Sequence, residues 1–385
     1  MKNIKLMNKI AKVGTDIFDP AVYSVSESVE APIGMMVRSA ALHDIEFNPE
    51  LVCIARCGAG VNNIPVDRCA EEGIVVFNTP GANANGVKEL TIAALMLASR
   101  KIVGGINWAT SLKGTEGVAK QVEAGKSKFA GCEIKGKKLG VIGLGAIGGM
   151  VANAASDLGM EVYGCDPFMT VNAAWNLSSA IKKAASFDDI YKTCDYISLH
   201  VPATKDTKGM INKDTIAMMK DGVKIVNLAR ADLVNTEDMK AALESGKVSS
   251  YVVDFPTDDT VGVDGIVTIP HLGASTAESE DNCAVMAANQ LVDFIENGNI
   301  VNSVNYPNVT LARSCEHRVC IMHKNIPGAI SKFTTALSDD NINIEHMANG
   351  SKGDYAYTII DTNSNLSHIV ETLKAVEGTI KVVVL

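Results

Sequence analysis

Short runs of β-branched and other apolar residues alternate with helix-forming segments between about residue 30 and residue 270. Strands that alternate with helices in this way are typical of βαβ units, so the pattern predicts a parallel sheet and an α/β fold. The predicted strands lie at 51–55, 73–77, 138–142, 161–165, 196–201 and 223–228.

Two longer helical patterns accompany these strands. Residues 85–113 are rich in helix formers and apolar side chains, which predicts a long, largely buried helix or helix pair able to carry the chain between domains. A second helix is predicted from 275 to 297. It ends at Glu296-Asn297-Gly298, where Gly298 suits a left-handed cap.

The pattern changes after His317. The order of predicted elements there is strand, helix, strand, strand, helix, strand. This βαββαβ order is typical of a small ferredoxin-like module. The elements lie at 319–323, 328–337, 342–347, 355–360, 366–375 and 379–385.

Length and charge narrow the class of protein. The chain has 385 residues, more than one hydrophobic core usually organises, so two or three domains are expected. The net charge is -9 and the isoelectric point is near 5.4, without a cluster of Lys and Arg. This balance argues against nucleic-acid binding and favours small-molecule chemistry.

The cysteines and the N-terminal segment indicate a reducing compartment. No two cysteines are spaced as CxxC or as zinc ligands, so we expect reduced, mostly buried thiols and no metal site. The sequence has no apolar run that suits a signal peptide or a membrane span, which predicts a cytoplasmic protein without a membrane partner. The nine cysteines are Cys53, Cys57, Cys69, Cys132, Cys165, Cys194, Cys283, Cys315 and Cys320.

A glycine-rich motif, GLGAIG at 143–148, lies between a predicted strand and a predicted helix. Gly143 allows a tight turn. Gly145 lets the N–H groups at the start of the helix, which includes Ala146 and Ile147, approach a pyrophosphate. Gly148 permits close packing of helix on strand. The motif therefore predicts a dinucleotide site in its required structural context.

Asp166 indicates which dinucleotide binds. It ends the next predicted strand, eighteen residues after Gly148, where a carboxylate can accept hydrogen bonds from the adenosine ribose. The same carboxylate repels a 2′-phosphate, and no Arg follows it. NAD is therefore predicted as the cofactor rather than NADP.

Three further segments offer groups for oxidising a 2-hydroxy acid, a reaction that needs a base for the hydroxyl proton and a cation for the carboxylate. In open α/β sheets such groups lie at the carboxyl ends of strands. One strand leads to Arg230, whose guanidinium can bind a carboxylate through two hydrogen bonds. Another ends at Asp254, with Asp258 and Asp259 close behind, and a third leads to His271. A carboxylate beside an imidazole raises its pKa and fixes its tautomer.

Each of these residues alone has a simpler explanation. A single Arg after a strand is more often part of a surface ion pair, and a His in a loop is usually only exposed. The order of the three segments along the chain favours a catalytic site. His200 also ends a predicted strand and competes with His271 for the catalytic role.

Over roughly its first 310 residues the chain resembles the D-isomer-specific 2-hydroxy-acid dehydrogenases. The matching stretches are VRSA, CIARCGAGVNNIPVD, GVIGLGAIG, SLHVPAT, NLARADLV and PHLGAST. The resemblance implies a Rossmann-type NAD-binding domain, residues 91–276, inserted into a flavodoxin-like substrate domain, residues 1–90 and 277–310. Residues 317–385 resemble an ACT domain, a ferredoxin-like α+β module that binds amino acids.

The resemblance implies that Arg230 and His271 are catalytic and that Asp254 contacts the nicotinamide carboxamide. The family's acid is usually a Glu five residues after that Asp, which selects Asp259. Alignment on the Phe-Pro-Thr run at 255–257 selects Asp258 instead. We predict Asp259, although the shorter side chain and the shortened loop before His271 depart from the family's pattern.

By the same resemblance, further residues surround the cofactor. His200 belongs to this wall, which favours His271 as the catalytic histidine. The wall residues are His200, Val201, Pro202, Ala229, Gly273 and Ala274.

Two arginines and a glycine-rich loop predict the substrate site. The backbone N–H groups of the loop suit a carboxylate. A phosphate carries a charge of about -2 and needs several donors, which two arginines supply. Either Arg alone would fit a solvated surface, but together they favour a phosphorylated acid. The predicted substrate-binding residues are Arg38, Ser39, Arg56, Gly58, Ala59 and Gly60.

The C-terminal module suggests an effector. His323 and Asn325 precede a predicted helix, and Asn343 follows twenty residues after His323. In family members that carry an ACT module, the matching residues bind serine across a dimer of modules. Amides and an imidazole can satisfy an amino acid without burying a net charge of their own. A helix cap without a ligand is the alternative.

Together these resemblances imply oxidation of 3-phospho-D-glycerate by NAD to 3-phosphohydroxypyruvate, the entry to serine synthesis. A homodimer or homotetramer with serine as effector is expected. One alternative is a relative that acts on another 2-hydroxy acid, such as 4-phosphoerythronate or 2-hydroxyglutarate. Another is a corepressor-like scaffold that senses NAD. The presence of Arg230, His271 and the acidic residues between 254 and 259 argues against a scaffold.

Overall fold

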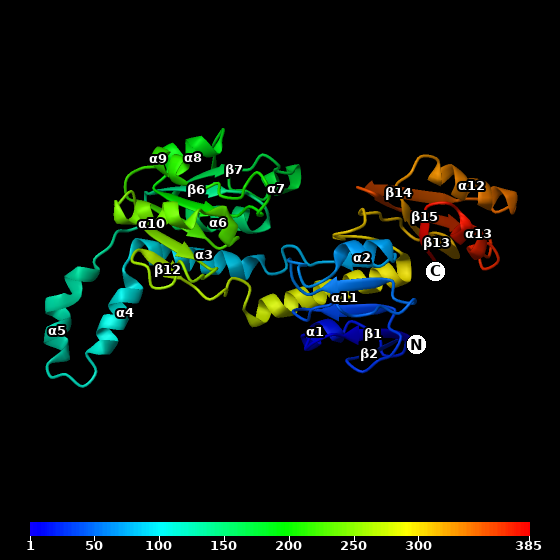
Figure 1. Ribbon diagram of the computed structural model, residues 1–385, viewed down its shortest axis with the longest axis horizontal. Coiled ribbons are helices and arrows are strands. Elements are labelled where there is room, and N and C mark those ends of the chain that lie inside the picture. Colours follow the sequence, from blue (N-terminus) through cyan, green and yellow to red (C-terminus); the bar gives the residue numbers. More distant parts are fainter. The chain divides into compact units, whose positions relative to one another are not determined.

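The computed structural model describes residues 1–171 and 173–385, and the chain divides into two compact units (Figure 1). One unit combines Met1–Asn83 with Ala277–Leu385, and the other is Ala84–Thr276. Each unit contains a parallel sheet, and the first also carries an antiparallel sheet built from the C-terminal residues. The predicted α/β fold is confirmed.

The unit Ala84–Thr276 is built on seven parallel strands in the order β12-β11-β10-β9-β6-β7-β8. In this sheet β7 lies on one side of β6 and β9 lies on the other, so the direction in which strands are added reverses at β6. Open α/β sheets bind ligands at such a reversal. The strands are β6 Lys138–Ile142, β7 Glu161–Cys165, β8 Lys182–Lys183, β9 Tyr196–Leu199, β10 Val223–Asn227, β11 Val248–Val253 and β12 Ile266–Thr268.

Helices cover both faces of this sheet. On one face α3 and α6 share a core with the strands, in which Leu95 and Val141 are fully buried. On the other face α8, α9 and α10 share a second core, which includes Ile190 and Ile197. The helices are α3 Ala84–Ser99, α6 Ala146–Asp157, α7 Val171–Trp175, α8 Phe187–Thr193, α9 Lys213–Met218 and α10 Thr236–Glu244.

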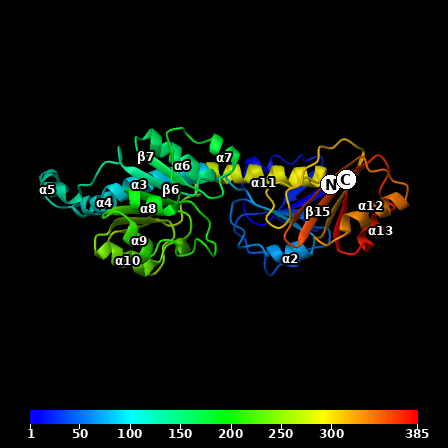
Figure 2. The same ribbon diagram turned by 90° about the horizontal axis from the view of Figure 1, so that it is seen from above.

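A helical arm projects from this unit (Figures 1 and 2). It consists of α4, Ile102–Ser111, α5, Val118–Gly125, and a 3-10 turn, Lys126–Phe129, whose Phe129 ring lies 5.3 Å from that of Trp108. The sequence predicts a largely buried helix or helix pair at 85–113, which corresponds to α3 and α4. The helix pair is confirmed, but burial is wrong for the second helix, since α4 has no buried residue.

The other unit contains a five-stranded parallel sheet in the order β2-β1-β3-β4-β5, which is the flavodoxin-like order. Its strands are β1 Lys2–Leu6, β2 Tyr23–Ser26, β3 Gly34–Val37, β4 Cys53–Arg56 and β5 Val75–Phe77. The helices are α1 Lys12–Thr15, α2 Val66–Glu71 and the long α11, Ala277–Asn297. One side of α11 packs into the core through Ala284, Leu291 and Phe294.

The C-terminal module forms an antiparallel sheet in the order β14-β15-β13-β16. The predicted βαββαβ order is confirmed by β13 His317–Lys324, α12 Ala329–Asp339, β14 His346–Lys352, β15 Tyr355–Thr362, α13 Val370–Ala375 and β16 Thr379–Val384. The strand predicted at 342–347 begins four residues later, at His346. Figure 2 shows β15 on the side of α12 and α13 that faces α11.

The two faces of the module's sheet are buried in different ways. On one face Val319 and Ile321 join Phe333 of α12 in a core of the module itself. On the other face Met322 and Tyr357 belong to the same core as α11 and the parallel sheet. The module and the N-terminal parallel sheet therefore share one hydrophobic core.

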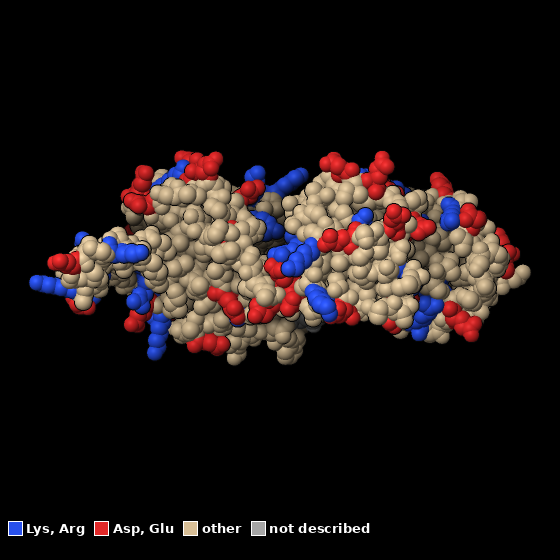
Figure 3. Space-filling view, turned by 90° about the horizontal axis from the view of Figure 1, so that it is seen from below, with Lys and Arg blue, Asp and Glu red and all other residues tan. Residues whose placement is uncertain are grey.

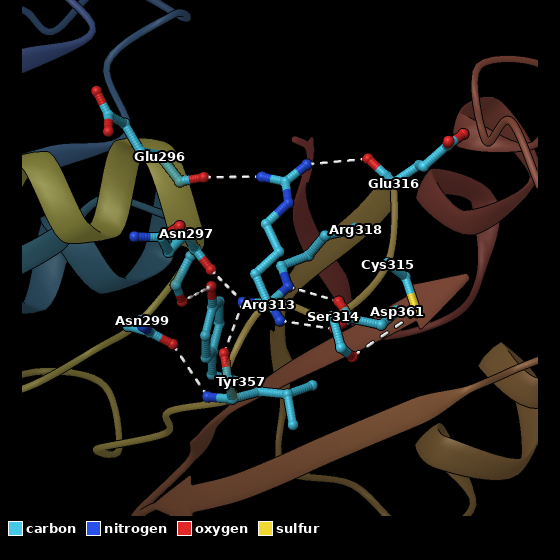
Figure 4. A network of polar contacts seen from close by, with 12 residues as sticks. Glu296, Asn297, Asn299, Arg313, Ser314, Cys315, Glu316, Arg318, Tyr357 and Asp361 are labelled. Carbon is cyan, nitrogen blue, oxygen red and sulfur yellow. Dashed lines mark hydrogen bonds and ion pairs between the residues drawn. The ribbon is translucent and has the colours of Figure 1, made fainter. Parts of the chain in front are cut away.

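Side chains from the module and the preceding linker cap the carboxyl end of α11 (Figure 4). Arg313 Nη1 donates to the carbonyl oxygen of Glu296 at 2.9 Å, and Arg318 Nη1 donates to that of Asn297 at 2.5 Å. The Tyr357 hydroxyl donates to the carbonyl oxygen of Gly298 at 2.6 Å. Cationic donors at a helix carboxyl end also favour the helix dipole. Gly298 has φ 70°, which confirms the predicted left-handed cap.

The nine cysteines are unbridged in the part of the chain that the structure describes, and seven of them are buried. Within residues 1–171 and 173–385, none of the helices has both the length and the apolar character needed to cross a membrane.

Candidate active site

The glycine-rich turn after β6 is shaped by close backbone contacts. Gly143 has φ 88°, and a side chain there would approach the carbonyl oxygen of His200 at 2.6 Å. A side chain at Gly148 would overlap with the carbonyl oxygen of Gly143. In contrast, no atom lies within 4 Å of a side chain placed at Gly145, so this edge of the turn is open to a ligand. Helix α6 begins at the next residue, Ala146, and directs its free N–H groups to the same edge.

Asp166, at the end of β7, closes one side of this turn. Its Oδ2 accepts from the Leu144 N–H at 2.9 Å and its Oδ1 from the Phe168 N–H at 2.8 Å. Beside it lies a hollow of about 490 Å³, whose lining includes Leu177 and Ile181. Lys182 and Lys183 also line this hollow, and its apolar part with a carboxylate at the edge fits the adenosine half of a dinucleotide.

His200 lies behind the glycine-rich turn. Its Nε2 lies 2.8 Å from the Ser198 hydroxyl oxygen, and burial lowers the pKa of the imidazole to about 4. The ring is therefore neutral at neutral pH. A neutral ring held by Ser198 suits a wall of the cofactor site rather than a proton acceptor.

Arg230 follows β10 and is fixed through its backbone. The buried Asn227 side chain donates to the Arg230 carbonyl oxygen at 2.8 Å and accepts from the Arg230 N–H at 3.3 Å. The guanidinium donates to the carbonyl oxygen of Ala229 at 2.7 Å. It is exposed and forms no ion pair with the described acidic residues. Its remaining donors can bind a carboxylate.

His271 lies on the loop between β12 and α11 in a left-handed conformation, with φ 52°. This conformation is uncommon for residues other than glycine and needs support from its surroundings. The exposed imidazole packs against Phe255, with ring centroids 4.7 Å apart. The ring is thus oriented while its nitrogen atoms are open to a substrate.

Asp254 provides that support. It is 1% exposed at the end of β11, and its two oxygens accept from the N–H groups of Leu272 at 2.8 Å and Gly273 at 2.9 Å. The carboxylate therefore holds the two residues that follow His271. Burial raises the pKa of Asp254.

The predicted acid partners of His271 lie on an exposed turn. Thr257 and Thr260 close this turn, since the Thr257 N–H donates to the Thr260 hydroxyl oxygen at 2.8 Å. Asp259 Oδ1 lies 3.7 Å from Lys240 Nζ, at the edge of ion-pair distance, and Asp258 is exposed. Neither Asp258 nor Asp259 is hydrogen-bonded to His271 among the residues described.

The predicted substrate residues lie together in the other unit. Asn8 orders Arg38 and Ser39, because its Oδ1 accepts from the Arg38 N–H and its Nδ2 donates to the Ser39 hydroxyl oxygen, both at 3.0 Å. The Arg38 guanidinium pairs with Glu280 at 2.7 Å and remains partly exposed. Arg56 lies near enough that Arg38 adds to the effect of burial in lowering the Arg56 pKa.

Gly58 makes room for Arg56. It has φ 147°, and a side chain there would overlap with the Arg56 guanidinium. The guanidinium therefore lies against the backbone of the Gly58-Ala59-Gly60 loop. This places a cation beside the backbone N–H groups that the sequence predicts for a carboxylate.

Comparison with known proteins identifies the fold and its chemistry. Residues 93–273 match the family model described as "D-isomer specific 2-hydroxyacid dehydrogenase, NAD binding domain". The D-3-phosphoglycerate dehydrogenase of Haemophilus influenzae is 31% identical over 357 residues, which cover 89% of this chain and 83% of that one. The chain belongs to the D-isomer-specific 2-hydroxyacid dehydrogenase family. It is an NAD-dependent dehydrogenase.

Further relatives agree with this assignment. The D-3-phosphoglycerate dehydrogenase of Escherichia coli K12 is 30% identical over 364 residues, or 91% of this chain and 85% of that one. A solved structure, NAD⁺-bound 3-phosphoglycerate dehydrogenase from Entamoeba histolytica, is 26% identical. It covers 79% of this chain and 98% of that one, with a TM-score of 0.61.

Sequence reasoning missed two parts of this dehydrogenase site. One is Asn227, which fixes the Arg230 backbone. A polar residue at the end of a buried strand was the sequence signal that could have pointed to it. The ring contact of Phe255 with His271 had no signal in the sequence, since it depends on how two loops meet.

The predicted effector residues of the module make separate hydrogen bonds in the described chain. His323 is 2% exposed, and its ring nitrogens lie 2.9 Å from the carbonyl oxygen of Lys324 and 2.9 Å from the Thr358 hydroxyl oxygen. Burial lowers the pKa of His323. Asn325 donates to Gly353, and Asn343 donates to its own neighbour Glu345.

Proposed function

We propose that this dehydrogenase oxidises 3-phospho-D-glycerate at C2 to 3-phosphohydroxypyruvate. The observation that carries the substrate assignment is the pair Arg38 and Arg56 beside the Gly58-Ala59-Gly60 loop. Two guanidinium groups match the charge of a phosphate, and the loop N–H groups suit a carboxylate. The names of the relatives from Haemophilus influenzae and Escherichia coli support the same substrate.

The residues of the NAD-binding unit suit the oxidation. NAD, held by the glycine-rich turn and Asp166, would supply the hydride acceptor for C2. The imidazole of His271 takes the C2 hydroxyl proton, so that a carbonyl forms as the O–H and C–H bonds break. Arg230 binds the carboxylate or the forming carbonyl oxygen through its free donors. Asp254 keeps the loop of His271 in its left-handed conformation.

The acid that pairs with His271 is part of this proposal. We assign it to Asp259, counted five residues from Asp254, with Asp258 as the alternative. The pair of Asp259 with Lys240 is exposed and spans 3.7 Å, so it is weak and easily exchanged. Parallel Asp→Asn variants at 258 and 259 distinguish them, since only the partner's loss should shift the acidic limb of the kcat/KM profile.

The proposal extends to assembly and regulation. The arm exposes Ile102, Val103, Ile106 and Val118, at 39%, 42%, 59% and 41% of their surfaces, which favours burial against a second copy of the chain in a homodimer or homotetramer. On the face shown in Figure 3, acidic and basic side chains are interspersed, as on an ordinary protein surface. Serine is the proposed effector, bound by His323, Asn325 and Asn343 across a dimer of modules.

The test is NADH formation with purified full-length protein. We expect turnover with 3-phospho-D-glycerate. The kcat/KM for 2-hydroxyglutarate or 4-phosphoerythronate should be at least tenfold lower. A His271→Ala variant that binds NAD normally should lack turnover. Addition of serine should lower the rate in wild type but not in Asn325→Ala. Turnover of another acid in place of phosphoglycerate would reassign the substrate.

A further inference from the structure

The outer side of α11 borders a hollow of about 840 Å³ that takes no part in the site described above. Residues 282, 285, 286, 289, 290 and 293, spaced as one stripe of a helix, form its floor. Its rims are Gly81-Ala82 before α3 and Asn299 and Val301 after α11. All these residues belong to the unit Met1–Asn83 and Ala277–Leu385. The hollow therefore lies wholly within one compact unit.

The lining of the hollow carries negative but no positive charge among the described residues. Among the described residues that line the hollow there is no Lys or Arg, and Asp293 provides the single carboxylate. Asp293 Oδ1 accepts from Asn297 Nδ2 at 2.9 Å and from Asn299 Nδ2 at 3.1 Å. Within the described residues, Oδ2 has no hydrogen bond and Asp293 no cationic partner. Half of this carboxylate is thus available to a donor from outside the chain.

The amides around Asp293 are fixed in place. Asn299 Oδ1 accepts from the Leu311 N–H at 3.0 Å, and the carbonyl oxygen of Asn297 accepts from Arg318. The carboxylate is therefore held by groups that are themselves held by the capped end of α11. A binding site preorganised in this way loses little entropy when it takes a ligand.

A second acceptor lies on the floor of the hollow. Gln290 is 8% exposed, and its Nε2 donates to the carbonyl oxygen of Asn78 at 3.2 Å. Its amide oxygen is buried and has no hydrogen-bond partner in the described part of the chain. A buried acceptor without a partner is costly, so a ligand donor that reaches it is favourable.

The remaining lining is largely apolar. Val285 and Met286 lie on the helix stripe, and Val301 on the rim is 40% exposed. Apolar surface combined with acceptors and a single negative charge suits a ligand with N–H donors, a positive charge and a hydrocarbon body. Phosphorylated acids and dinucleotides are anionic, and the absence of a cation among the described lining residues disfavours them.

We propose that this hollow binds a small organic ammonium ion, with its ammonium group on Asp293 Oδ2 and its hydrocarbon body against Val285, Met286 and Val301. The site is separate from the residues assigned to substrate and cofactor, and its ligand differs from theirs in the sign of its charge. The dehydrogenase substrates should therefore not compete with this ligand for the hollow.

The test compares three probes of the same shape: pentylammonium, 1-pentanol and pentanoate. Binding to the full-length protein is measured by ligand-observed NMR. Wild type should bind pentylammonium, and bind pentanol and pentanoate more weakly. Asp293→Asn should lower the affinity for pentylammonium by about fivefold, as expected for the loss of a partly exposed ion pair. The affinity for pentanol should not change. Because both Asn297 and Asn299 donate to Oδ1, an asparagine can keep these bonds while it removes the charge.

The matched control is Asp281→Asn, which removes an exposed carboxylate of the same helix outside the hollow. It should bind pentylammonium as wild type does, and saturating NAD with 3-phospho-D-glycerate should not displace the probe. Equal binding by wild type and Asp293→Asn would overturn the proposal. Equal binding of the three probes, displacement by the substrates, or no binding to wild type would do so as well.

Discussion

Arg318 and Asp361 form an ion pair that is closed to solvent, with Nε 2.5 Å from Oδ1 and Nη2 2.7 Å from Oδ2. The two residues face each other across β13 and β15. Arg318 Nη1 also donates to the carbonyl oxygens of Asn297 and Leu311. The pair thus fixes the module's sheet to the end of α11, and folding of the two parts should be coupled.

Loss of one partner should therefore destabilise the unit strongly. Arg318→Met leaves Asp361 buried without a cation and should lower the free energy of unfolding by about 3–5 kcal/mol in urea denaturation. Glu377→Gln is the matched control, because its pair with Lys332 is exposed to solvent and its loss should leave the free energy of unfolding almost unchanged. The double variant Arg318→Met with Asp361→Leu should recover most of the loss, since it leaves no unpaired charge. A single variant as stable as wild type would refute the coupling.

Asp254→Asn tests whether the carboxylate positions His271. Both oxygens of Asp254 accept from backbone N–H groups, and an amide NH₂ cannot replace one of them. We expect kcat to fall by about 10- to 100-fold, the value of one charge-assisted hydrogen bond. The pH profile of kcat/KM should shift, because the imidazole is displaced from Phe255.

The NAD dissociation constant of Asp254→Asn, measured by fluorescence, should stay within about twofold, since the glycine-rich turn and Asp166 are untouched. Wild-type kcat together with weaker NAD binding would show instead that Asp254 serves the cofactor and not the loop.

The sequence predicted most of the fold because its local signals agree with the tertiary structure. The apolar run at 138–142, followed by the glycine-rich turn, coincides with β6. The strands β1 and β2, before residue 30, were missed, since their mixed burial gives no continuous apolar run. The apolar residues of α4 predicted burial, but none of them is buried in the described chain, because propensity does not reveal which partner covers a helix.

The candidate site was predictable where a motif sets the local geometry and not where distant loops meet. The turn around Gly143 and the position of Asp166 follow from short-range spacing. The acid partner of His271 did not follow, since one residue more or less in the loop 255–265 selects a different aspartate. Asp254 was assigned to the cofactor by resemblance, and its hydrogen bonds to the loop of His271 appear only in three dimensions.

Gly58→Ala tests the placement of Arg56. A side chain at Gly58 would overlap with the guanidinium, so Arg56 must move away from the loop. We expect KM for 3-phospho-D-glycerate to rise by at least about tenfold, with the NAD dissociation constant unchanged. Gly209→Ala controls for backbone strain, since Gly209 has φ 63° and nothing lies within 4 Å of a side chain there. An unchanged KM in Gly58→Ala would remove Arg56 from the substrate site.

His200 should make the folded protein sensitive to acid. Burial lowers its pKa to about 4 in the folded state, whereas the pKa is about 6.5 in an unfolded chain. Between these values the unfolded state binds a proton that the folded state does not, so the free energy of unfolding falls as pH decreases from about 6.5 to about 4. Gln cannot be protonated and can still bond to Ser198. From pH 7 to pH 5, wild type should therefore lose about 1–2 kcal/mol more than His200→Gln in urea denaturation. Parallel curves for the two proteins would show that the imidazole is solvated in the folded state.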